Sequence, residues 1–181
     1  MELHSERLLL RNLAETDLDD FLFYRCDPEV CKFQGFSPFD RQQAADFIAS
    51  QKDRPFGVPG QWLQLAIVDK TMNKLIGDCA VKLREPDPRI AEIGCTISPV
   101  YQKKDYGGET IVTLMKFLFE EKQVHRIEEI TDTQNIPAIK LLQRLGFRKE
   151  GHFIENIFFK GKWGSEFQFA MLKRDWDRRK R

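Results

Sequence analysis

One short loop carries the residue types of a phosphate-binding site. It begins at Gln102, continues through Lys103 and Lys104, and ends on Gly107 and Gly108 at the start of an expected helix. A polar, glycine-containing loop directly before a helix offers unpaired backbone N–H groups and the positive end of the helix dipole, which suit phosphate or pyrophosphate. The two lysines add positive charge. Taken alone, the pattern also fits a plain connection between a strand and a helix.

The segments around this loop determine how it would be held. Residues 89–98 predict a strand before the loop, residues 107–122 a helix after it, and residues 125–132 a further strand. A strand, a crossover helix and another strand favour a local parallel pair. A second helix is expected over residues 136–145, closed by Gly146. We therefore expect the sheet to be parallel around the loop.

The other segments predict an α/β (α+β) fold. A strand over residues 7–12 leads into a helix that begins near residue 16 and is interrupted at Asp27 and Pro28. Further elements are a helix over 39–52, an antiparallel meander over 62–69, 74–83 and 89–98, and a hairpin of 148–160 and 163–173 around Gly161. These segments predict one domain over residues 1–181, with a mixed sheet of about seven strands and about four helices.

Composition excludes several partner classes. Lys plus Arg at 29 against Asp plus Glu at 28 leave a net charge of +1, so no global field attracts DNA or an anionic membrane. The chain shows neither a secretory signal pattern nor an apolar stretch long enough for a bilayer, which favours a cytoplasmic protein. The cysteines are Cys26, Cys31, Cys79 and Cys95. They form no Cys-x-x-Cys pair, so we expect reduced thiols and no metal.

Several segments together, in this order, carry a family resemblance. They are Ser5-Glu6-Arg7-Leu8-Leu9-Leu10-Arg11, Ala91-Glu92-Ile93-Gly94, the Gln-x-x-x-x-Gly loop from Gln102, Asn135 at a helix start, and Leu145-Gly146-Phe147-Arg148-Lys149-Glu150-Gly151. The chain resembles the GCN5-related N-acetyltransferases (GNAT), and within them the RimJ/RimL-like group of ribosomal-protein N-terminal acetyltransferases. The resemblance covers essentially the whole chain. No single motif is specific, but their order and spacing are.

The resemblance implies acetyl-coenzyme A (acetyl-CoA) as co-substrate. In that family, the strand before the loop splays from its parallel neighbour, and the pantetheine arm lies in the gap and pairs with the strand backbone. This implies that Thr96 and Ile97 lie against the arm and that residues 102–108 bind the pyrophosphate. Asn135 would reach the arm through its side-chain amide, although a helix N-cap is the alternative role for an Asn at this position.

The loop departs from the family pattern at one position. Asp105 stands where the family usually has its first glycine. Aspartate tolerates a left-handed backbone better than most residues, so the loop conformation is compatible with it. Its charge opposes a pyrophosphate unless the carboxylate points to solvent or pairs with Lys103 or Lys104. We expect acetyl-CoA to bind with some loss of affinity. Tyr106 follows in the same loop.

The resemblance also assigns roles in acetyl transfer. Glu92 lies where the family often has a general base; a surface carboxylate on a strand is the alternative. Backbone N–H groups near Cys95 to Ile97 would polarise the thioester carbonyl. The usual proton donors are absent, because Leu142 and Ala138 stand at the Tyr and Ser positions. Tyr106 is one candidate for that missing role.

The acetyl acceptor is expected to be a primary amine: a protein N-terminus, a polyamine, an amino sugar or another small amine. We expect Phe33, Phe36, Phe56 and Phe158 to line its pocket. A catalytically weak acyl-CoA-binding or regulatory protein of the same fold is the alternative function. A homodimer stays open. The basic residues 173–181 predict a solvated tail, with a ribosome contact as the alternative.

Overall fold

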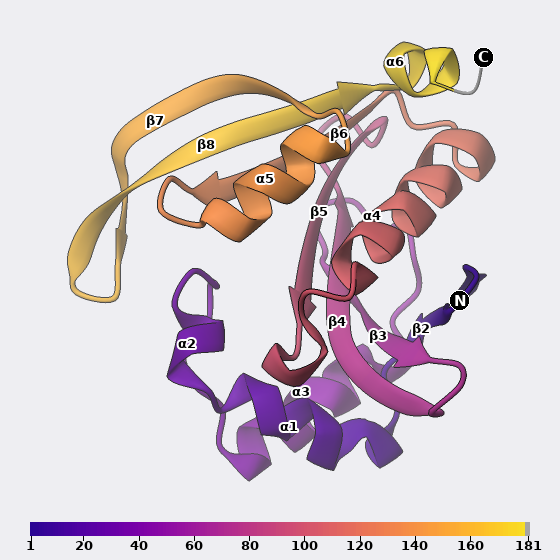
Figure 1. The fold of residues 1–181 in the computed structure, drawn as a ribbon, viewed down its shortest axis with the longest axis vertical. Coiled ribbons are helices and arrows are strands. Elements are labelled where there is room, and N and C mark those ends of the chain that lie inside the picture. Colours follow the sequence, from indigo (N-terminus) through magenta and orange to yellow (C-terminus); the bar gives the residue numbers. More distant parts are fainter. Residues whose placement is uncertain (180–181) are drawn as a thin grey trace.

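The computed structural model describes residues 1–179 and is built around one mixed sheet of eight strands (Figure 1). The strand order is β1-β2-β3-β4-β5-β6-β8-β7. The bounds are β1 Glu2–His4, β2 Leu8–Asn12, β3 Leu63–Asp69, β4 Lys74–Leu83, β5 Ile90–Ile97, β6 Arg126–Asp132, β7 Arg148–Phe159 and β8 Lys162–Leu172. The predicted mixed α/β fold is confirmed. The strand that the sequence did not predict is β1, which pairs with β2 at the edge.

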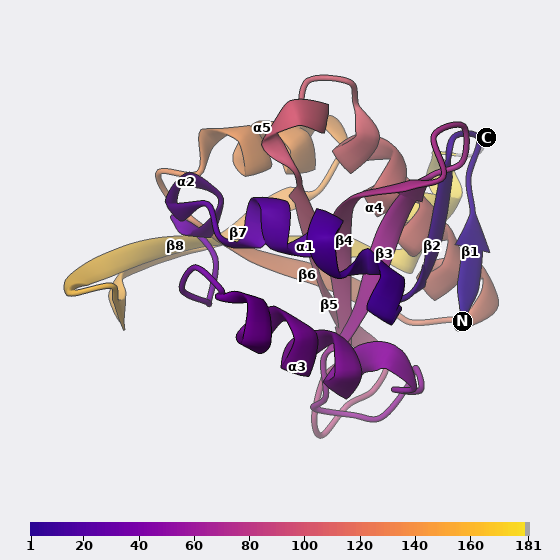
Figure 2. The same cartoon turned by 90° about the horizontal axis from the view of Figure 1, so that it is seen from below.

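Helices cover both faces of this sheet. They are α1 Leu18–Arg25, α2 Pro28–Cys31, α3 Arg41–Lys52, α4 Tyr106–Lys116, α5 Ile136–Arg144 and α6 Lys173–Arg178, with a π-helical turn Phe117–Glu121 continuing α4. α4 and α5 lie on one side of the sheet, whereas α1 and α3 lie on the other (Figure 2). None of the helices described over residues 1–179 is long and apolar enough to cross a membrane.

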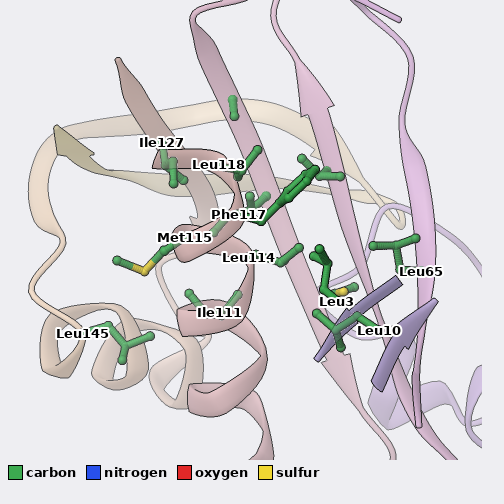
Figure 3. Close-up of a cluster of buried hydrophobic side chains, with 14 of the residues drawn as sticks. Leu3, Leu10, Leu65, Ile111, Leu114, Met115, Phe117, Leu118, Ile127 and Leu145 are labelled. Carbon is green, nitrogen blue, oxygen red and sulfur yellow. The ribbon is translucent and has the colours of Figure 1, made fainter. Parts of the chain in front are cut away.

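The main core lies between α4 and the sheet (Figure 3). The apolar side chains Ile111, Leu114, Met115 and Leu118 recur at the spacing of one helix face. All four are at most 1 % exposed, and they pack with sheet residues that include Leu10, Leu65 and Ile127. This packing holds the start of α4, and with it the preceding loop, against β5.

A second core lies under α1 and α3. Phe21, Tyr24 and Ile48 pack there against Ala66 and Val68 of β3. The neighbouring β3 residues Leu65 and Ile67 belong to the α4 core instead. This alternation follows from the period of two along a strand and places the two helix layers on opposite faces.

The sheet opens between its two parallel strands. β4 and β5 pair antiparallel from Gly77 opposite Ile97 to Leu83 opposite Ala91. β5 and β6 pair only over three positions, and the last pair is Glu92 with Glu128. Beyond it the strands diverge, as Figure 1 shows. The edge of β5 that faces β6 is therefore free of strand pairing from residue 93 to residue 97, as the resemblance implied.

The prediction of a solvated tail from residue 173 onward is wrong for the described part. Residues Lys173–Arg178 form α6, and the Trp176 indole N–H donates to Glu120 at 3.0 Å. The Trp176 ring also stacks on Phe119, with 6.1 Å between ring centroids. An amphipathic turn with one large aromatic gains more by docking on the end of α4 than by staying in water. Residues 180 and 181 lie outside the described residues.

Candidate active site

The loop 102–108 presents a row of backbone N–H groups at the start of α4. The first helical hydrogen bond of α4 runs from Glu109 N–H to the Asp105 carbonyl at 3.1 Å. The N–H groups from Lys103 to Gly108 precede that bond and have no acceptor within the helix. Lys103 and Asp105 both have a φ of 62°, in the left-handed region. A backbone that alternates between left-handed and other conformations turns successive N–H groups to one side, and these groups form a concavity that can bind an anion.

The carboxylate of Asp105 pairs with a partner that the sequence analysis missed. Arg144, in the last turn of α5, holds both oxygens of Asp105, one of them at 3.1 Å from Nη1. These hydrogen bonds lower the pKa of Asp105, and the charge of the guanidinium adds to the effect. The carboxylate is thus paired with Arg144 rather than with Lys103 or Lys104, the two partners considered from the sequence. Arg144 lies 39 positions away in the sequence, so only the fold brings it to the loop.

The position of Asp105 also explains Gly108. A Cβ at Gly108 would collide with the Asp105 carboxylate and with the Arg144 guanidinium. The ion pair thus lies directly over the first turn of α4, beside the N–H groups that the pyrophosphate is expected to use.

The other residues predicted to bind the cofactor differ in the groups to which they are hydrogen-bonded. The Gln102 amide donates to the Ile97 carbonyl at 3.0 Å and so ties the loop to the end of β5. Tyr106 is turned inward, and its hydroxyl donates to Asp69 at 2.7 Å. Its hydroxyl is therefore engaged in the protein interior. Asn135 caps α5, accepting from Ala138 N–H at 3.4 Å.

The N-terminal motif that begins at Ser5 is hydrogen-bonded to the first turn of α4 through Glu109. The Glu109 carboxylate accepts from Ser5 Oγ at 2.6 Å, from Arg7 N–H at 2.8 Å and from Arg7 Nε at 2.6 Å. Burial acts to raise the pKa of Glu109, but these hydrogen bonds outweigh it and leave the pKa lowered. The Arg7 side chain also donates to the Lys104 carbonyl at 3.1 Å. The motif thus fixes the helix start and the loop together.

A cavity of about 990 Å³ opens on the opposite face of the sheet. Its walls include residues 92–96 of β5 and residues 130–132 of β6, so it reaches the gap between the diverging strands. Phe33 and Phe36 line it, as predicted. Phe56 does not, because its ring packs edge-on against Phe117 in the α4 core. Phe158 also points elsewhere, and the neighbouring Phe159 takes the wall position.

Three carboxylates line this cavity, together with Lys32, Lys160 and Lys162. The carboxylates are those of Glu92, Asp132 and Glu166. Glu92 is paired with Lys82, with 2.7 Å between Oε2 and Nζ, and the Lys82 ammonium lies 4.4 Å from the centroid of the Trp62 ring. Thr96 also faces the cavity, whereas Ile97 packs toward the α4 core.

A buried ion pair supports the aromatic wall. Arg25 is 3 % exposed and Asp78 is fully buried, and they share two hydrogen bonds. Tyr24 donates to the same carboxylate at 2.6 Å, and Gln64 also donates to it. The guanidinium lies 3.9 Å from the centroid of the Phe36 ring, so the pair positions the lining aromatic rather than offering a free charge.

A carboxyl at the gap was missed by the sequence analysis. Glu129 lies on β6 one residue beyond the last pair with β5. Burial raises its pKa to about 8, and the charge of Glu92 adds to the effect. Adjacent Glu128 is an ordinary ion-pair carboxylate, bound to Arg126 at 2.6 Å. The two differ in the face of the sheet to which they point and in their position relative to the last β5–β6 pair, and the sequence does not show where that pairing ends.

The cysteines do not form a metal or redox site within residues 1–179. All four thiols are free, and no grouping of His, Cys, Asp and Glu side chains there could hold a metal ion. Cys79 is fully buried, and burial raises its thiol pKa well above the ordinary value.

Comparison with known proteins agrees with this geometry. Residues 7–148 match the family described as Acetyltransferase (GNAT) domain. The chain is 33% identical over 175 residues to the "uncharacterized N-acetyltransferase p20" of Bacillus licheniformis, covering 96% of this chain and 97% of that protein. It is 29% identical over 99 residues to the spermidine N(1)-acetyltransferase of Vibrio cholerae, covering 54% of this chain and 56% of that one.

The fold is also seen in solved structures. A GNAT-family acetyltransferase from Bacillus anthracis superposes with a TM-score of 0.88 at 24% identity, covering 96% of this chain and 99% of that one. Members of the family use acetyl-CoA as co-substrate. The chain therefore belongs to the GNAT family and is an acetyl-CoA-dependent acyltransferase.

Proposed function

We propose that the chain transfers the acetyl group of acetyl-CoA directly to a primary amine bound in the cavity on the α1/α3 face. The observation that supports this proposal most is that the cavity reaches the gap between β5 and β6. The same residues of β5 and β6 that bound the gap also wall the cavity. A thioester entering from the α4 side and an amine entering from the opposite face would meet where β5 and β6 part.

Residues of the gap and loop would hold the thioester. The pantetheine arm would pair with the free edge of β5 at Thr96 and Ile97, and the N–H groups of the loop from Gln102 to Gly108 would bind the pyrophosphate. Backbone N–H groups near Cys95 would polarise the carbonyl oxygen as negative charge develops on it.

Glu92 is the proposed general base. It lies on the cavity side of β5 beside the gap, and it is half-buried. An amine must lose a proton to form an amide, and a carboxylate within reach, directly or through one water, can accept it. Lys82 holds the Glu92 side chain at 2.7 Å and so fixes its orientation.

The cavity combines aromatic rings with charges of both signs, because Lys32, Lys160 and Lys162 line it beside its carboxylates. Asp132 and Glu166 add carboxylates beyond Glu92, and the rings of Phe33 and Phe36 provide apolar and cation–π contacts. We propose a polyamine-like amine as the first acceptor to test, in keeping with the named activity of the Vibrio cholerae relative. A protein N-terminus is the second, in keeping with the RimJ/RimL-like opening motif at Ser5 to Arg11.

The test is a thiol-release assay with acetyl-CoA and a panel of polyamines, amino sugars and peptides with free N-termini. We expect saturable release with at least one amine, and loss of about 10²-fold or more in kcat for Glu92→Gln. Glu85→Gln, which removes an exposed carboxylate, is the control and should keep wild-type rates.

Two outcomes would count against the proposal. Glu92→Gln with wild-type kcat would remove Glu92 from the mechanism. Tight binding of acetyl-CoA with no thiol release for any amine would favour the acyl-CoA-binding alternative.

A further inference from the structure

Glu129 occupies a distinctive position in the gap. It follows Glu128, whose pairing with Glu92 is the last between β5 and β6. Side chains alternate along a strand, and Ile127 packs into the α4 core. Glu129 therefore projects toward the α4/α5 side, whereas Glu92 lines the cavity on the other side. The two carboxyls face opposite sides of the sheet at the point where it opens.

Glu129 is partly buried beside the apolar α4 core. Its cross-strand neighbour on β8 is Phe169, which is fully buried. On β5, its nearest titratable neighbours are Glu92 and the Cys95 thiol, whose pKa burial raises and the charge of Glu129 raises further. α5 contributes Leu142 to the same core. Among the described residues, the Glu129 carboxyl makes neither a hydrogen bond nor an ion pair, in contrast to the adjacent Glu128, which is bound to Arg126.

Ionising this partly buried carboxyl is costly, because it has no hydrogen-bond donor and the nearby charge of Glu92 opposes a second negative charge. Burial raises the pKa of Glu129 to about 8, which favours the protonated form near neutral pH. A protonated carboxyl carries one O–H donor. Glu129 thus holds a proton at the gap, on the face from which the thioester would enter.

The usual proton donors of this position are absent. Leu142 is 1 % exposed and apolar, Ala138 has no polar atom, and the Tyr106 hydroxyl is engaged by Asp69. Breaking a thioester nevertheless leaves a thiolate that must be protonated. Building on the proposed function, we propose that the Glu129 carboxyl is the general acid that protonates the sulfur of coenzyme A as the C–S bond breaks.

The step balances within the proposed reaction. The amine lone pair forms the C–N bond, and the C–S electron pair moves to sulfur. The Glu129 proton passes to sulfur, and the surplus proton of the amine passes to Glu92. Transfer of that proton to solvent, and uptake of one by Glu129, restores both carboxyls. Two carboxyls on opposite faces of the gap would divide the acid and base roles according to their surroundings.

The first test compares Glu129→Gln with Glu128→Gln, which removes the adjacent carboxylate on the opposite face. A general acid must be protonated, so its contribution falls as pH rises through about 8. We expect Glu129→Gln to lower kcat by about 10²-fold, to leave the KM for acetyl-CoA within about twofold and to abolish the alkaline decline of kcat. Glu128→Gln should retain that decline. Wild-type kcat in Glu129→Gln would overturn the proposal.

A second readout needs no turnover. Coenzyme A bound with a free thiol is titrated with alkali, and the thiolate is followed by its ultraviolet absorbance. Above pH 8 an ionised Glu129 repels a nearby thiolate, so the bound thiol should titrate at higher pH in wild type than in Glu129→Gln. Identical titrations would show that the carboxyl does not face the sulfur, even if amine acetylation itself is confirmed. Failure to bind coenzyme A would overturn this inference together with the proposed function.

Discussion

The roles of the glutamates near β5 and β6 depend on their positions relative to the point where these strands diverge. Glu92, Glu128 and Glu129 are the same residue type within one small region, yet Glu92 lines the cavity, Glu128 is bound to Arg126, and burial raises the pKa of Glu129. The differences follow from strand alternation and from the end of the β5–β6 pairing. Residue identity alone assigns none of these roles.

Asp105 allows a direct test at this scale. Replacing it by glycine keeps the left-handed backbone, removes a negative charge beside the expected pyrophosphate and releases Arg144 to attract it. The charge effect at a surface distance of a few ångströms is about 1 kcal/mol, which is about fivefold in affinity. We therefore expect Asp105→Gly to lower the Kd for acetyl-CoA by about fivefold or more, measured by calorimetry.

The control for this prediction separates the two charges. Asp105→Gly combined with Arg144→Gln should lose part of the gain, because the freed guanidinium is then absent. Unchanged or weaker binding in the single variant would show that Asp105 does not oppose the cofactor.

At the scale of elements, α1 is tied to the sheet by a polar group in its core. Asp78 of β4 accepts from Tyr24, Arg25 and Gln64, and both members of the Arg25–Asp78 pair are buried. Removing one member of such a pair leaves an uncompensated charge in a low dielectric. The aromatic wall of the cavity packs on the same guanidinium. Arg25 therefore contributes both to the stability of the fold and to the position of the aromatic wall of the cavity.

Replacing Asp78 should therefore lower the free energy of unfolding far more than replacing a surface carboxylate does. We expect Asp78→Ala to lower the free energy of unfolding in urea by about 3–5 kcal/mol, and Arg25→Met in the same chain to recover part of it. Glu15→Ala, which breaks the exposed pair with Lys52, should leave it unchanged. An equally small effect at Asp78 would mean that the pair does not hold α1.

The elements themselves were largely predictable from the sequence. Hydrophobic periodicity identified α4 and the meander, and the crossover from β5 to β6 implied the parallel pair. The sequence did not predict that α6 packs on the protein, because most of its residues are charged and Trp176 is its one aromatic contact with the π-helical turn. Nor could it pair Arg144 with Asp105, since that contact depends on how α5 lies against the loop.

At the scale of the whole molecule, the sheet separates the two expected reactants. α4, α5 and the N–H-rich loop lie on one face, and the cavity with its carboxylates and aromatic rings lies on the other. The diverging strands β5 and β6 provide the one place where the two sides meet in the part of the chain that the structure describes. The proposed transfer of an acetyl group to an amine depends on that arrangement.

The most direct measurement follows the acetyl group itself. The protein is incubated with acetyl-CoA labelled with carbon-13 in the acetyl group and with the amine that releases most thiol, and the products are examined by mass spectrometry. The account predicts labelled acetyl on the amine nitrogen, in amounts equal to the free coenzyme A formed. Labelled acetate as the sole product, or labelled acetyl retained on the protein, would contradict it.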